Sequence, residues 1–115
     1  MKAYTDLEQS KKLAEILHVG SADMFFICVG DREIIRVNDN IKGYNNWDTY
    51  PAWSLAALLN VLPYPQLSKD KLGGGKVGWM VSVYPDNCRY DSCWHENPID
   101  ACYEIIIKLH EQQLL

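Results

Sequence analysis

The chain has 115 residues, of which 48% are hydrophobic, and a formal net charge of −4 at neutral pH. This length and apolar content suffice for one hydrophobic core, so we expect residues 1–115 to form a single domain. The acidic balance, with no Lys/Arg run longer than Lys11-Lys12, argues against DNA or RNA as a partner, because that affinity depends largely on neutralising phosphates.

The sequence also argues against a membrane partner. No stretch approaches the roughly 18 to 20 consecutive apolar residues that span a bilayer, and the first residues lack the apolar run of a signal peptide. We therefore expect a cytoplasmic protein. In that reducing compartment the cysteines are expected to be free and mostly buried thiols: Cys28, Cys88, Cys93 and Cys102.

The first predicted element is a helix over about residues 6–18. Thr5 and Glu8 have the spacing of a capping box, in which each side chain satisfies a backbone N–H of the first turn. Gly20 provides a stop signal after the apolar stripe ends. The charged residues between these signals are typical of a solvated helix face.

Two β-prone runs follow, at residues 24–29 and 33–37, and Gly30-Asp31 between them predicts a hairpin. Both alternate sets of side chains in the first run are apolar. We therefore expect this strand to lie centrally with cover on both faces, or to pack near a helix. Residues 38–47 are rich in turn-forming Asn, Asp and Gly, which predicts a loop.

The second half predicts another helix and another hairpin. The helix begins between Pro51 and Ser54 and ends near Val61, before two prolines. Residues 63–76 form a polar connector with a flexible glycine triplet. A strand over residues 77–84 then alternates in polarity, and after a turn residues 88–95 can return as its antiparallel partner.

The chain closes with the clearest helix signal. Asn97 is a preferred N-cap residue, Pro98 suits the first helical position, and Asp100 places negative charge at the positive end of the helix dipole. Apolar residues then recur at helical spacing on a face that we expect to lie against a sheet: Ile99, Cys102, Tyr103, Ile106, Leu109 and His110.

These elements predict an α+β protein in the order αββαββα, with a mainly antiparallel four-stranded sheet and helices packed on it. The pattern leaves open whether the helices lie on both faces of the sheet, as in an α/β/α sandwich. We find no residue-level repeat between the two helix and hairpin units.

Three segments carry a family resemblance: Tyr-Pro-Ala-Trp-Ser-Leu-Ala-Ala-Leu-Leu at 50–59, Gly-Trp-Met-Val-Ser-Val at 78–83, and Asn-Pro-Ile-Asp-Ala-Cys-Tyr-Glu-Ile-Ile at 97–106. Over about residues 47–109 the chain resembles the phage ABA sandwich domain, and also short proteins of phages and mobile elements of gut bacteria. The resemblance implies a small α/β sandwich of phage or mobile-element origin. It implies no activity and no site residues.

A Cys/His cluster is the sharpest chemical possibility in the sequence. Cys88, Cys93, His95 and Cys102 are residue types that zinc prefers, but they lack paired Cys-x-x-Cys spacing. In a regular strand Cys93 and His95 share a face that Cys88 does not. A metal-binding or Cys/His-dependent enzyme or regulator is therefore the alternative interpretation, and we assign no catalytic, metal-binding or cofactor-binding residue.

An aromatic stretch supplies the candidate interaction residues Tyr44, Trp47 and Tyr50. Tyr and Trp are enriched at protein interfaces because they offer large contact areas. We therefore expect a non-enzymatic accessory protein that binds a host or phage protein. The competing interpretation is that Trp53 and Trp79 belong to the core while Trp47 and Tyr50 hold the preceding loop against it.

Overall fold

The computed structural model describes residues 2–37 and 48–115. These residues form an α+β protein, as the sequence predicts. The first half contains α1 (Leu7–Ala14), a 3₁₀ turn η1 (Val19–Ser21), and strands β1 (Met24–Val29), β2 (Arg32–Val37) and β3 (Asp48–Ala52). The second half contains α2 (Leu55–Val61), β4 (Gln66–Leu72), β5 (Lys76–Val83), the 3₁₀ turn η3 (Pro85–Asn87), β6 (Tyr90–Asp91) and α3 (Pro98–Glu111).

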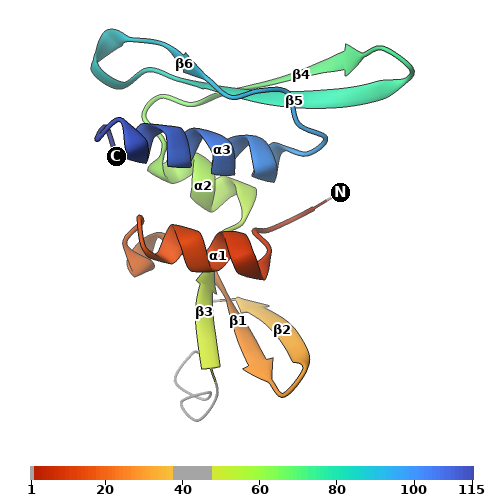
Figure 1. Ribbon diagram of the computed structural model, residues 1–115, viewed down its shortest axis with the longest axis vertical. Coiled ribbons are helices and arrows are strands. Elements are labelled where there is room, and N and C mark those ends of the chain that lie inside the picture. Colours follow the sequence, from red (N-terminus) through yellow and green to blue (C-terminus); the bar gives the residue numbers. More distant parts are fainter. Residues whose placement is uncertain (1, 38–47) are drawn as a thin grey trace.

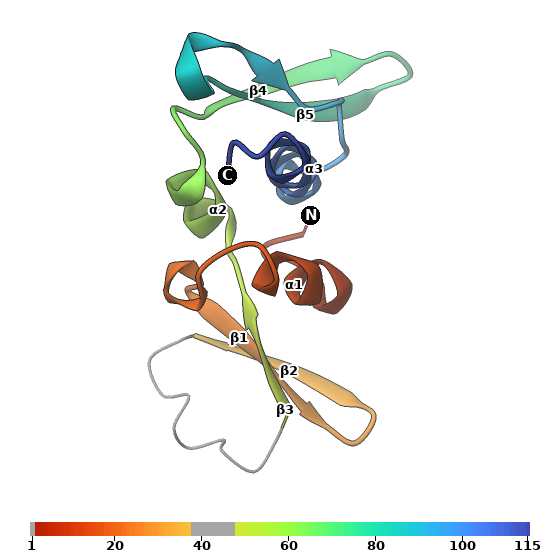
Figure 2. The same cartoon turned by 60° about the vertical axis from the view of Figure 1, so that its left-hand side comes forward.

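The strands form two three-stranded antiparallel sheets at opposite ends of the molecule, with the helices between them (Figure 1). One sheet has the order β2-β1-β3 and the other the order β4-β5-β6. The helix α1 packs against β3, whereas α3 packs against both β5 and α2. The turned view in Figure 2 shows the same succession of sheet, helices and sheet.

The prediction of one four-stranded sheet in the order αββαββα is therefore wrong, and the helices do not enclose a central sheet. Two strands escaped prediction, β3 and β4, because both are edge strands whose sequences do not alternate cleanly. Pro51 is tolerated in β3 because an edge strand pairs on one side only. The exposed charges of β4, Lys69, Asp70 and Lys71, suit an edge that must not pair with other chains.

The glycine triplet is the turn of the β4–β5 hairpin and not part of a connector. Gly73, Gly74 and Gly75 have φ values of 28°, 68° and 78°, in the left-handed region that side chains disfavour. They join Leu72 to Lys76, which are paired residues of the two strands. The return strand is confirmed in part, since β6 pairs with β5 at only two residue pairs.

The first hairpin is confirmed, and its pairing runs from Met24 opposite Val37 to Val29 opposite Arg32. The strand β1 lies at the centre of its sheet. Phe25, Phe26 and Ile27 are all buried although neighbours in a strand point to opposite faces. Both faces of β1 are therefore covered, as predicted.

The cap of α1 lies one residue later than predicted. Asp6 is the N-cap, and it forms the capping box with Gln9. Thr5 is buried, and its hydroxyl pairs with that of Ser10 and accepts the backbone N–H of Trp53. Because the Thr5 hydroxyl already forms these tertiary hydrogen bonds, Asp6 and not Thr5 caps the helix.

The last helix begins as predicted, with Asn97 accepting the N–H of Asp100 at 2.9 Å and Pro98 in the first turn. Its apolar face packs into a core that also contains Trp53, Leu58 and Val81. The fully buried residues of this face are Ile99, Ala101, Cys102, Ile105, Ile106 and Leu109, whereas His110 is exposed. None of the described helices combines the length and hydrophobicity needed to cross a bilayer.

Replacing the N-cap, Asn97→Ala, should lower the free energy of unfolding by about 1 kcal/mol, because it removes the acceptor for the first-turn N–H. We expect the melting temperature to fall by about 4 °C in a thermal scan. Asn60→Ala, at an exposed position of α2, is the matched control and should stay near the wild type. Equal melting temperatures for the two variants would contradict the capping role.

Candidate functional site

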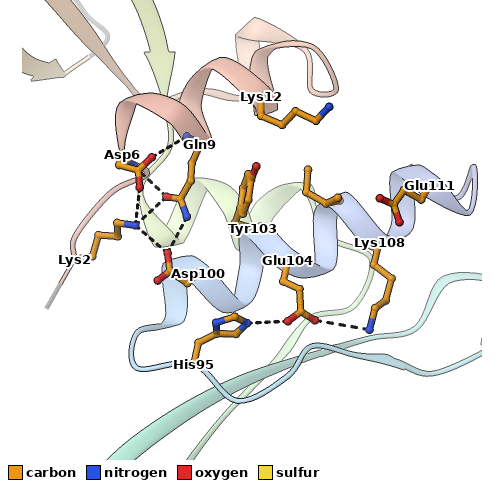
Figure 3. Close-up of a pocket in the computed structure, with 11 residues that line it drawn as sticks. Lys2, Asp6, Gln9, Lys12, His95, Asp100, Tyr103, Glu104, Lys108 and Glu111 are labelled. Atoms are coloured by element: carbon orange, nitrogen blue, oxygen red, sulfur yellow. Dashed lines mark hydrogen bonds and ion pairs between the residues drawn. The ribbon is translucent and has the colours of Figure 1, made fainter.

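A groove of about 640 Å³ lies between α1 and α3 (Figure 3). Its walls carry charged side chains of both signs, with Tyr103 and Ile107 between them. The lining residues come from three parts of the chain. These are the N-terminal segment with α1 (Lys2, Asp6, Gln9, Lys12), the residue His95, and α3 (Asp100, Tyr103, Glu104, Ile107, Lys108, Glu111). The groove thus joins segments from the two ends of the sequence.

A network centred on the Asp100 carboxylate lies at one end of the groove. Lys2 Nζ and Gln9 Nε2 donate to Oδ1 at 2.9 and 2.8 Å, and Asn97 Nδ2 donates to Oδ2 at 2.8 Å. Burial acts to raise the pKa of Asp100, but these three hydrogen bonds outweigh it and hold the pKa below its usual value. The ionised carboxylate therefore ties the N-terminal segment to the start of α3.

A β-bulge shapes the chain that leads into α3. Backbone hydrogen bonds join Ser92 to Val81 and join His95 to Trp79 in both directions. Between these two pairs β5 has one residue and the returning chain has two, which defines a bulge. The two bulged residues are Cys93 and Trp94.

The bulge is tied to α3 through Glu104. The N–H of Cys93 donates to both carboxylate oxygens at 3.0 and 3.2 Å, and His95 Nε2 lies 2.8 Å from Oε1. Lys108 Nζ lies 3.7 Å from Oε2. Burial acts to raise the pKa of Glu104, but the bonds from His95 and Cys93 prevail and lower it. Figure 3 shows His95, Glu104 and Lys108 as one chain of polar contacts beside the groove.

The alternative interpretation, a metal site built from Cys88, Cys93, His95 and Cys102, finds no support in the described residues. Within residues 2–37 and 48–115, no three His, Cys, Asp or Glu side chains are placed to hold a metal ion. Cys88 and Cys93 are exposed, so the expectation of mostly buried thiols is also wrong for them. Cys102 is fully buried, and burial raises the pKa of its thiol to about 12. The bulge also interrupts the regular alternation of side chains along the strand. The prediction that Cys93 and His95 share a face depends on that alternation, so it does not apply here.

The predicted interaction residues are only partly within the described chain. Tyr44 and Trp47 lie outside it. Tyr50 lies on β3 and is half-buried, with Lys11 Nζ 4.8 Å from its ring centroid. Tyr50 therefore links its sheet to α1. Trp53 belongs to the core, as the competing interpretation holds, and its Nε1 donates to the Ser21 hydroxyl at 2.9 Å.

Sequence reasoning missed the groove. The prediction that Tyr103 lies on the face against a sheet is wrong, since Tyr103 lines the groove. A usable signal was Ile107, which interrupts the charged residues of α3 one turn after Tyr103. Such interruptions mark an apolar patch outside the main stripe. The sequence gives no indication that α1 lies opposite this patch, because the two helices are separated by most of the chain.

Comparisons of the chain with family models, with curated proteins and with solved structures give no match. The site is therefore interpreted from its own geometry.

The substitution Asp100→Asn should destabilise the protein at pH 7 by about 1 kcal/mol, since it removes the charge from bonds that are partly exposed to solvent. A carboxylate whose pKa is lowered by folding stabilises the protein above its unfolded pKa of about 3.9, and this contribution is lost as the pH falls through the lower folded pKa. Urea unfolding at pH 7 and near pH 3 should show a difference from wild type that shrinks in acid. A pH-independent difference would contradict the assignment.

Thiol labelling should separate Cys102 from Cys88 and Cys93. We expect Cys88 and Cys93 to react rapidly with a maleimide in the native protein, and Cys102 to react only after unfolding, because its sulfur is buried and its pKa raised. Peptide mapping by mass spectrometry after timed labelling measures this order. Rapid native labelling of Cys102 would show that α3 does not pack as described.

Proposed function

We propose that the protein acts by binding another protein, without catalysing a reaction, and that the groove between α1 and α3 is a contact surface. The observation that carries the proposal is the position of Tyr103 and Ile107, half-buried on α3 between charged side chains of both helices. An apolar centre with a charged rim is the usual anatomy of a protein interface. The groove volume suits a short segment that inserts one or two large side chains.

The ionisable groups of the groove support binding over catalysis. The Asp100 carboxylate is engaged by Lys2, Gln9 and Asn97, and the Glu104 carboxylate is engaged by His95. A Cys/His-dependent enzyme would need a reactive thiolate at hydrogen-bond distance from an imidazole. The described residues show His95 bonded to a carboxylate instead.

The resemblance to small phage proteins adds a context to this proposal. An accessory protein of a phage or mobile element would act in the cytoplasm on a host or phage protein. Tyr44 and Trp47 belong to the proposal as a second contact, because Tyr and Trp are frequent binding determinants at protein interfaces.

A photo-reactive amino acid at position 107 tests the groove directly. We expect it to crosslink a partner in host cytosol, whereas the same group at position 60 on α2 should not. Ile107→Glu should weaken binding of that partner at least about tenfold, because it places a charge in the apolar centre. Circular dichroism and the melting temperature confirm that each variant folds.

Two results would contradict the proposal: crosslinking that is equal at positions 107 and 60, or a partner whose binding is unaffected by Ile107→Glu. A parallel pull-down with Trp47→Ala separates the loop from the groove. Loss of the partner with Trp47→Ala alone would move the contact surface to the loop.

A further inference from the structure

We propose a second contact site, on the side of the molecule where α2, β5 and α3 all terminate, which binds an extended proline-rich segment next to a basic side chain. The end of α3 in question is the one marked C in Figure 1. A hollow of about 470 Å³ lies there. It shares no lining residue with the groove between α1 and α3, so this site does not depend on the proposed function of that groove.

The hollow has mainly apolar walls supplied by three turns. The turn after α2 provides Pro63 and Tyr64, the turn after β5 provides Tyr84 and Pro85, and the end of the chain provides Leu114. The backbone N–H of Tyr84 donates to the carbonyl of Pro63 at 3.1 Å, which holds the first two turns together. This part of the wall is therefore held in place without a ligand.

Unusual backbone conformations are concentrated at this end. Four non-glycine residues of the described chain have positive φ: Tyr64 (49°), Asp86 (51°), Asn87 (65°) and Gln113 (59°). Three of them line the hollow, and Asn87 directly follows Asp86. Asp and Asn tolerate this region, but a bulky Tyr is disfavoured there because of its Cβ. Such strain clusters at binding and switch sites, where it fixes side chains in place.

Tyr64 is held out into solvent by this conformation, with 81% of its surface exposed. Tyr84 is half-buried, and its hydroxyl donates to Gln66 Oε1 at 3.3 Å. Grooves lined by aromatic rings accept the polyproline II helix, whose ridged surface packs against ring faces and needs no ladder of backbone hydrogen bonds. The two tyrosines and the half-buried Pro63 offer such a surface.

The charge of the hollow specifies the flanking residue of the ligand. Among the described residues that line it, Asp86 is the only acidic side chain and none is Lys, Arg or His. The chain as a whole is also acidic, with a net charge of −4. An Arg or Lys beside the proline segment can pair with Asp86, whereas an acidic residue would be repelled.

Fluorescence anisotropy with a labelled proline-rich peptide that carries one terminal arginine tests the site. We expect saturable binding with a dissociation constant of about 100 μM or tighter. Replacing the arginine by glutamate, or the prolines by alanine, should weaken binding at least about tenfold.

Two variants assign the binding to the hollow. Tyr64→Gly should weaken binding at least about tenfold while keeping or raising the melting temperature, since glycine accepts positive φ without strain. Asp86→Asn should weaken only the arginine peptide. Trp94→Ala removes another exposed aromatic residue outside the hollow, and Ile107→Glu alters the groove; both should bind like wild type.

The absence of saturable binding up to about 1 mM would overturn the proposal, as would equal binding by Tyr64→Gly or equal binding of the glutamate peptide. Light scattering at several protein concentrations adds a further test. Self-association that Tyr64→Gly abolishes would identify the hollow as an interface between copies of the chain, and would also overturn it.

Discussion

The packing of α3 is the constraint on which the rest of the structure depends. Its fully buried face, including Ile105 and Ile106, contacts β5 and α2, so these elements form one apolar core. The helix α1 packs instead on β3 of the other sheet. Leu13 of α1 also belongs to the apolar core around α3, whereas polar contacts at Asp100 bridge the two helices at one end of the groove.

The two sheets are joined through the first residues of the chain and the segment around Trp53. The N–H of Thr5 donates to the Trp53 carbonyl, and the N–H of Trp53 donates to the Thr5 hydroxyl. The Trp53 ring is fully buried in the core, while its backbone continues from β3. Trp53 thus connects the core around α3 with the sheet that carries α1. Leu13 and Ala22 belong to the same core, and Lys2 and Gln9 add polar bridges to Asp100.

The sequence predicts those features that depend on local rules. The helix start at Asn97-Pro98 and the β1–β2 hairpin follow from cap chemistry and apolar periodicity. The strands β3 and β4 were missed because edge strands can carry Pro51 and the charges of Lys69 to Lys71 without losing their one set of partners. The groove was missed because its two walls meet only through tertiary packing, and the bulge at Cys93-Trp94 was missed because it is defined by pairing with β5.

The two proposed sites differ in how their polar groups and backbone are satisfied. In the groove, opposite charges such as Lys2 and Asp100 already neutralise each other, so a ligand gains most from the apolar patch between them. At the hollow, the exposed Tyr64 residue has its backbone in a costly conformation, and the charged side chain among the described lining residues is Asp86. Selection for stability alone would favour glycine at position 64, because glycine accepts a positive φ without strain. It would also favour fewer apolar side chains at exposed positions. The exposed aromatic ring at this position is therefore better explained by contact with a partner than by folding.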